Sequence, residues 1–187
     1  MIGLTIDAIE VGDSAEITRR ATQEDIAAFV ESVGDYNPVH ADAEYAAETP
    51  FGEPIAPGIW TAGLVSAVIG TRLPGPGAIY LSQDLRFLRP VKFGDAICAR
   101  VAVVEANREK NRVRLRTVCT NQRGEEVLTG EALVMPSRAH VVYDRPREPE
   151  RAVALWALNP WTWAAQATAM WLSFGLSALA GLDANQP

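Results

Sequence analysis

The sequence predicts an α+β fold in which an antiparallel sheet curls around one buried helix. The first observation is the segment 57–73, which carries one charge and several small residues, so a helix there is apolar on nearly every side and must be wrapped. The second is the change of apolar period from near four to two beyond the breaker 74–77, because a period of two is typical of strands. With 187 residues and no internal repeat, we expect one domain and a tail.

Local signals place the other elements. After a short alternating opening at 15–19, a helix is predicted from Thr22, which can cap it, to Gly34, a typical C-terminal glycine. A short second helix is expected at 42–48. Alternating segments beyond the breaker predict four strands, at 81–87, 97–103, 112–116 and 127–135. Turn-rich connections are expected to join the last three strands as antiparallel hairpins.

The composition shifts twice after residue 136. Residues 137–151 carry arginines among prolines and acids, whereas 152–182 contain no charged residue. We therefore expect a folded domain at 1–136, a charged linker at 137–151 and a hydrophobic helical tail at 152–187. The apolar face of such a tail needs a cover, and three remain open: the protein's own dimer, an apolar granule or lipid surface, or a bilayer core.

Charge and cysteine usage exclude several classes of protein. The formal net charge is −6, and no run of Lys and Arg offers the basic face that a nucleic-acid binder needs. Cys98 and Cys119 lack metal-ligand spacing, so no metal site is expected. Residues 1–13 lack the order of a secretion signal, which favours a cytoplasmic protein acting on small molecules or apolar surfaces.

The loop Asp35-Tyr36-Asn37-Pro38-Val39-His40 concentrates the chemistry of the chain. It holds a carboxylate, an amide and one of only two histidines around a proline, and it follows a helix, where loops often carry function. An acid/base pair of Asp35 and His40 is the functional interpretation. The structural alternative has Asp35 capping a turn, Asn37 forming an Asx turn and His40 bonded at the next helix start.

The stretch from Gly34 to Asp42 resembles the hydratase motif of the MaoC-like (R)-specific enoyl-CoA hydratases. Three later stretches also resemble that family, at 73–83, 87–95 and 129–132. The resemblance covers about residues 10–136. It implies a single hot dog fold and a homodimer that acts on acyl-CoA substrates. It implies no separate cofactor, because the substrate itself carries coenzyme A.

The resemblance also assigns roles. Asp35 and His40 would hold a water between them and add it to a trans-2-enoyl-CoA, giving an (R)-3-hydroxyacyl-CoA. The backbone amide of Ala67, supported by Ser66, would bind the thioester oxyanion, and Asn37 would hold the loop in shape. One departure is Pro57, where family members commonly have histidine before the glycine; a proline fits the first turn of a helix but removes any polar contact of that side chain.

Two other functions remain open at this point. One is dehydration of 3-hydroxyacyl thioesters in fatty-acid elongation, on coenzyme A or an acyl carrier protein, since a reversible addition uses the same groups. The other is a non-catalytic thioester-binding or granule-associated protein, because the tail faintly resembles phasin-like segments that coat polyhydroxyalkanoate granules. Four cations are candidates for the coenzyme A phosphates by charge alone, and solvated surface charge is their alternative: Arg72, Arg86, Arg89 and Lys92.

Overall fold

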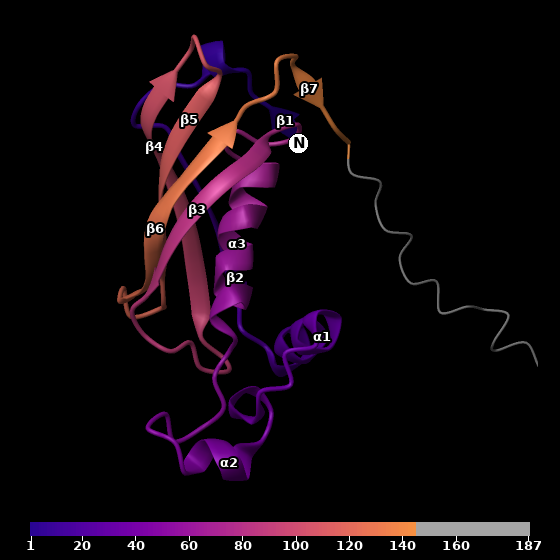
Figure 1. Ribbon diagram of the computed structural model, residues 1–187, viewed down its shortest axis with the longest axis vertical. Helices are drawn as coiled ribbons and strands as arrows, with labels where there is room; N and C mark the ends of the chain where they lie inside the picture. The colour runs from indigo at the N-terminus through magenta and orange to yellow at the C-terminus, as the bar shows by residue number, and fades with distance from the viewer. Residues whose placement is uncertain (145–187) are drawn as a thin grey trace, which may run out of the picture. The chain divides into compact units, whose positions relative to one another are not determined.

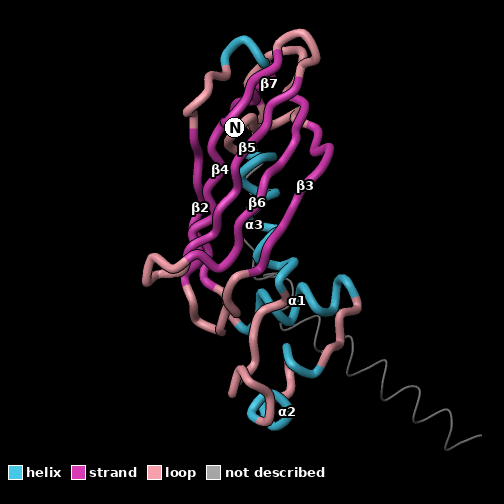
Figure 2. Tube along the Cα trace, turned by 60° about the vertical axis from the view of Figure 1, so that its left-hand side comes forward, coloured by secondary structure: helices cyan, strands magenta, loops and turns pink. Residues whose placement is uncertain are grey.

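The structure is a computed structural model that describes residues 1–144; residues 145–187 lie outside the described part. The helices are η1 (Ile6–Ala8), α1 (Gln23–Val33), η2 (Pro38–His40), α2 (Ala43–Ala47) and α3 (Gly58–Thr71). The strands are β1 (Ile2–Gly3), β2 (Ser14–Arg20), β3 (Ile79–Phe87), β4 (Ala96–Asn107), β5 (Arg112–Thr120), β6 (Glu126–Met135) and β7 (Val141–Val142). In Figures 1 and 2, α3 runs along one face of the sheet, while α1 and α2 lie beyond one end of it.

The main sheet has five antiparallel strands in the order β2-β4-β5-β6-β3. The two hairpins expected among the last three strands are confirmed, as is the α+β class with a sheet around one helix. The main sheet has one strand more than the four predicted, because Ser14–Arg20 pairs with β4 along its whole length, and the short strands β1 and β7 were not predicted either. The sequence does alternate at 15–19, but none of the side chains of this edge strand is buried, so the apolar face that marks a strand is missing.

The inner face of α3 carries the core. Its buried apolar side chains are Trp60, Leu64, Val65, Val68 and Ile69. They belong to the same core cluster as the inward residues of the sheet, among them Val101, Leu115 and Leu128, which are fully buried. Burying side chains of this size contributes about 1.5–3 kcal/mol each. The prediction of a central helix against the sheet is therefore confirmed.

The opposite side of α3 is open within residues 1–144, although the sequence predicted wrapping on nearly every side. Ile59 is 58% exposed, and Gly63, Ser66 and Gly70 continue an exposed stripe at helical spacing. A side chain added at Gly63 would meet nothing within 4 Å. The described chain wraps only one face because its sheet is a single layer with α3 on one side.

Helix α1 brings the chain to the Asp35–His40 loop, as the sequence predicted. The Thr22 side chain accepts a hydrogen bond from the Asp25 amide, and Gly34 ends the helix with φ of 73°, a left-handed conformation that favours glycine. Arg19 holds Asp25 with two hydrogen bonds of 2.9 and 2.7 Å, which lowers the pKa of that carboxyl group. These contacts tie α1 to the neighbouring strand, β2, and so fix where the following loop begins.

The first part of the predicted charged linker joins a small second sheet. Val141–Val142 pairs with Ile2–Gly3 as an antiparallel two-stranded sheet. The rest of that linker, and the tail predicted at 152–187, lie outside the described residues, so the domain boundaries stay a prediction. Within residues 1–144, no helix is both long and apolar enough to cross a bilayer.

Candidate active site

The loop that leaves α1 is shaped by its own backbone and by Asn37. The amides of Gly34 and Asp35 both donate to the Val30 carbonyl, at 2.8 and 3.2 Å, which turns the chain sharply. The Asn37 side-chain oxygen accepts a hydrogen bond of 3.4 Å from the Val39 amide and caps η2. As a result, Asp35 stands at the end of α1 and His40 at the end of η2.

The structure brings the carboxylate of Asp35 and the imidazole of His40 together. His40 Nε2 lies 3.7 Å from Asp35 Oδ2, and the side chains are 10% and 45% exposed respectively. This distance is too long for a direct hydrogen bond and suits two groups that share one water molecule. The half-exposed carboxylate gives that water a path from solvent.

The other ring nitrogen of His40 fixes the tautomer. His40 Nδ1 lies 2.7 Å from the carbonyl oxygen of Ile55, and a carbonyl only accepts hydrogen bonds, so Nδ1 carries the hydrogen. In the neutral imidazole, Nε2 is then unprotonated and faces Asp35 as an acceptor. The site therefore offers two acceptors to a single water.

The segment after Ile55 leads directly into the N-terminus of α3. Pro57 precedes the helix and provides no side-chain cap, and the described chain supplies no acceptor for the amides of Gly58 and Ile59. These amides lie at the positive end of the helix dipole. They are free donors, and they follow closely after Ile55, whose carbonyl contacts His40.

A cavity of about 460 Å³ lies beside this helix end. Its walls are mainly apolar and include Phe51, Ile55, Gly58, Ile59, Phe87 and Leu88. Thr61 also lines it, and the buried hydroxyl of Thr61 finds no hydrogen-bond partner within residues 1–144. Because Ile55 both lines the cavity and binds His40, the pair of Asp35 and His40 and the cavity adjoin the same short segment.

The predicted oxyanion residues are not brought to this pair. Ser66 lies on the open stripe of α3, about 12 Å along the axis from Gly58 at about 1.5 Å per residue. Ala67 is inside the helix, where an amide donates to the carbonyl four residues earlier and is not free for a ligand. No hydrogen bond or ion pair of the described residues links either residue to Asp35 or His40.

Of the four cations considered for coenzyme A phosphates, only Arg89 lines the cavity. It donates a hydrogen bond of 2.7 Å to the Glu126 carbonyl, which leaves other guanidinium hydrogens for a ligand. Lys92 forms an ion pair with Glu53, while Arg72 and Arg86 are exposed away from the cavity lining. Within residues 1–144, no group of His, Cys, Asp and Glu gathers as a metal site.

An antiparallel sheet around one long helix, with a loop beyond the end of the sheet that brings Asp35 and His40 together, is the arrangement of the hot dog class of hydratases. The sequence model of the MaoC-like domain family matches residues 8–125, and the chain belongs to this family. It is 48% identical over 132 residues to a 3-hydroxybutyryl-CoA dehydratase of Methylorubrum extorquens, covering 70% of this chain and 83% of the relative. It is 46% identical over 131 residues to an (R)-specific enoyl-CoA hydratase of Rhodospirillum rubrum, with 70% and 90% covered.

Solved structures agree with the fold. An unliganded R-hydratase from Pseudomonas aeruginosa superposes with a TM-score of 0.75 at 44% identity, covering 79% of this chain and 95% of that chain. An (R)-hydratase from Aeromonas caviae, involved in PHA biosynthesis, has a TM-score of 0.67 at 40% identity and covers 68% and 97%. The predicted hot dog fold and the predicted family are confirmed.

Two features of the site escaped the sequence-based interpretation. The Ile55 carbonyl is a backbone group, and nothing in its side chain announces that it orients a histidine. The free amides of Gly58 and Ile59 could have been found, because every helix leaves its first amides without partners and Pro57-Gly58 marks where α3 begins.

Proposed function

We propose that this chain hydrates trans-2-enoyl-CoA to (R)-3-hydroxyacyl-CoA. The observation that carries the proposal is the pairing of His40 Nε2 with the Asp35 carboxylate at 3.7 Å, with Nδ1 engaged by the Ile55 carbonyl. The names and identities of the relatives support the same reaction and substrate class.

The geometry supports addition of a shared water. Asp35 and His40 both act as acceptors, so the water donates one hydrogen to each and turns a lone pair toward the substrate. Its oxygen bonds to the β-carbon while one of its protons passes to the pair. The electrons of the double bond move toward the thioester oxygen, and the α-carbon then takes a proton from the same pair. Water is thereby added across the double bond, with both new bonds on one face.

The charge that develops on the thioester oxygen needs donors. The amides of Gly58 and Ile59 fit this task better than that of Ala67, because they are free and lie at the positive end of α3. The adjoining apolar cavity suits the hydrocarbon part of a thioester. Pro57 does not obstruct this arrangement, since a proline beside the first turn leaves both amides available.

Dehydration of 3-hydroxyacyl thioesters is the second candidate, favoured by the dehydratase name of the relative from Methylorubrum extorquens. The same groups serve both directions. The test follows the loss of crotonyl-CoA absorbance, and then the reverse reaction with (R)-3-hydroxybutyryl-CoA and with the same acyl group on an acyl carrier protein. If the protein turns over neither kind of thioester, a non-catalytic binding protein would be favoured instead.

We also infer that the working form is a homodimer. The open stripe of α3 and the exposed apolar residues of the edge strand β3, Ile79, Leu81 and Phe87 among them, lie uncovered in the single chain. Small residues on the stripe let a second helix approach closely, and an edge strand can pair with its copy.

The dimer has a direct test. Gly63→Arg should shift the protein from dimer to monomer in sedimentation velocity while leaving it folded, because the single chain has open space at this position. Ala28→Arg, on the exposed side of α1, is the matched control and should remain dimeric. A Gly63→Arg protein that sediments as the wild type does would refute this interface.

The tail remains a proposal drawn from its composition. Residues 152–182 carry no charge, which favours association with an apolar granule or membrane surface, and the protein would then work in the cytoplasm at that surface. Removing 152–187 should leave turnover of crotonyl-CoA within about twofold and reduce co-sedimentation with lipid vesicles or granules. Unchanged co-sedimentation would show that the tail is not a tether.

A further inference from the structure

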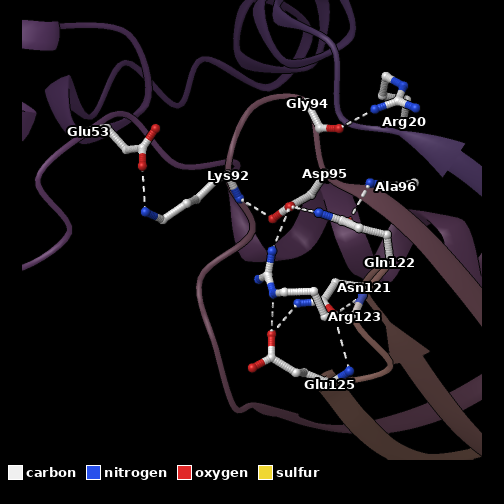
Figure 3. Close-up of polar contacts among 10 residues, drawn as sticks. All are labelled: Arg20, Glu53, Lys92, Gly94, Asp95, Ala96, Asn121, Gln122, Arg123 and Glu125. Carbon is white, nitrogen blue, oxygen red and sulfur yellow. Dashed lines mark hydrogen bonds and ion pairs between the residues drawn. The ribbon is translucent and has the colours of Figure 1, made fainter.

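The segment between α2 and α3 is fastened to the turn that joins β3 and β4. The Ala56 amide donates a hydrogen bond of 2.8 Å to the Val91 carbonyl. Ile55 pairs with Lys92 in an isolated antiparallel bridge. The Lys92 ammonium group also forms an ion pair with the Glu53 carboxylate, shown in Figure 3. Side-chain and backbone contacts therefore hold the same short stretch from one side.

The other side of this segment holds the catalytic loop. The Ile55 amide donates to the Val39 carbonyl at 3.2 Å, and the Ile55 carbonyl accepts from His40 Nδ1 at 2.7 Å. Ile55 thus stands between Lys92 and His40. Any displacement of Ile55 relative to the sheet changes the hydrogen bond that sets the orientation and the tautomer of the imidazole.

The turn that carries Lys92 is itself rigidly held. The Lys92 amide donates to Asp95 Oδ2 at 2.9 Å, and Gln122 Nε2 donates to Asp95 Oδ1 at 2.6 Å. Asp95 is only 5% exposed, and Arg123 approaches the same oxygen at 3.6 Å. Figure 3 shows this carboxylate facing the amide of Lys92 and the side chains of the turn between β5 and β6. Lys92 is therefore a fixed point to which the Glu53 segment is tied.

We propose that Glu53 and Lys92 are positioning residues for His40. Their ion pair holds the Ile55 carbonyl where it keeps the hydrogen on Nδ1 and leaves Nε2 free to accept from the catalytic water. If the Glu53 segment shifts, the Nδ1 hydrogen bond weakens and the tautomer with hydrogen on Nε2 gains population. That tautomer cannot accept from the water. The effect on turnover rests on the proposed function, whereas the effect on the histidine does not.

The expected size follows from exposure and geometry. The two side chains are 43% and 50% exposed, and an exposed ion pair shifts a population by less than about fivefold. Displacing a catalytic group lowers the rate further than the change in population alone, by up to about a hundredfold for a displacement of about 1 Å. The backbone contacts of Ile55 and Ala56 remain in the variants, so we expect kcat to fall between about twofold and tenfold.

The test observes the histidine directly. The chain has only two histidines, so nitrogen-15 NMR of the labelled full-length protein resolves the ring nitrogens of His40 and His140. Glu53→Gln and Lys92→Met should each move the His40 Nδ1 and Nε2 shifts toward each other, as the tautomers mix. Glu105→Gln weakens the exposed Arg114–Glu105 pair between β4 and β5, which contacts neither Lys92 nor the residues that hold it, and should leave His40 unchanged. Reversing both charges, Glu53→Lys with Lys92→Glu, should restore the wild-type shifts.

Kinetics separate this role from phosphate binding by Lys92. Under the proposal, Glu53→Gln and Lys92→Met both lower kcat with KM within about twofold of wild type. A lysine that binds coenzyme A would instead raise KM in Lys92→Met only. His40 shifts that stay at their wild-type values in both variants would overturn the proposal. Shifts that move as expected in a protein without turnover on any thioester would uphold the positioning role and refute the proposed function.

Discussion

Replacing Asp35 with asparagine should lower the hydration rate of crotonyl-CoA by about a hundredfold to ten-thousandfold. Asparagine keeps the size of the side chain but does not take a proton, so the water between residue 35 and His40 Nε2 loses one of its two acceptors with basic character. The side chain is 45% exposed, and its loss of charge should leave folding almost unchanged. The measurement is kcat by absorbance loss, with circular dichroism to confirm the fold.

His40→Ala should produce a loss of similar size, and the double variant should be little worse than either single one. Two groups that hold one water act as a unit, so their effects are not additive. Glu24→Gln, an exposed acid in the first turn of α1 and away from the Asp35–His40 loop, is the control and should keep full activity. Additive losses, or a His40→Ala protein with near wild-type turnover, would show that the residues do not share one water.

The second large effect concerns Gly130 in β6. A Cβ atom built there would lie 1.9 Å from the carbonyl oxygen of Asp84 and 2.9 Å from Gln83 Nε2. Because the first contact is with backbone, Gly130→Ala must push β3 away from β6 and break part of their pairing. We expect a loss of about 3 kcal/mol in the free energy of unfolding, at the upper end of overpacking effects.

Urea denaturation measures this loss. Ser82→Ala, an exposed position on the same strand β3, is the matched control and should change the free energy of unfolding by less than about 0.5 kcal/mol. A Gly130→Ala protein as stable as the control would mean that β3 and β6 do not approach as closely as described. The resemblance motif at 129–132 contains this glycine, and the close approach gives a physical reason for it.

The parts of the fold that local chemistry determines could be predicted from the sequence. The Thr22 side chain caps the start of α1 and Gly34 ends it, as predicted, because capping depends on neighbours within a few residues. The hairpins of β4, β5 and β6 follow from short turns between alternating strands. The Asp35 and His40 pair was predictable for the same reason, since one loop carries both residues.

What could not be predicted depends on contacts between distant segments. The Ile55 carbonyl meets His40 only because Ile55 is paired with Lys92, 37 residues further along the chain. The assignment of the oxyanion donor to Ala67 came from a family resemblance, whereas the start of α3 at Gly58, which local chemistry marks, leaves the amides of Gly58 and Ile59 free. The open stripe around Gly63 was also hidden, because a sequence shows that a helix is apolar but not which side its own chain covers.

Hydration of crotonyl-CoA in deuterium oxide tests the central claim most directly, with the product analysed for configuration at both carbons. Under the proposed function the product is (R)-3-hydroxybutyryl-CoA, and one water held by Asp35 and His40, with its proton returned through the same pair, adds both new bonds from one face. The product then carries deuterium at the α-carbon on the same face as the new hydroxyl group. Deuterium on the face opposite the hydroxyl group would contradict a single acid/base pair acting from one side, and an (S) product would contradict the proposed specificity.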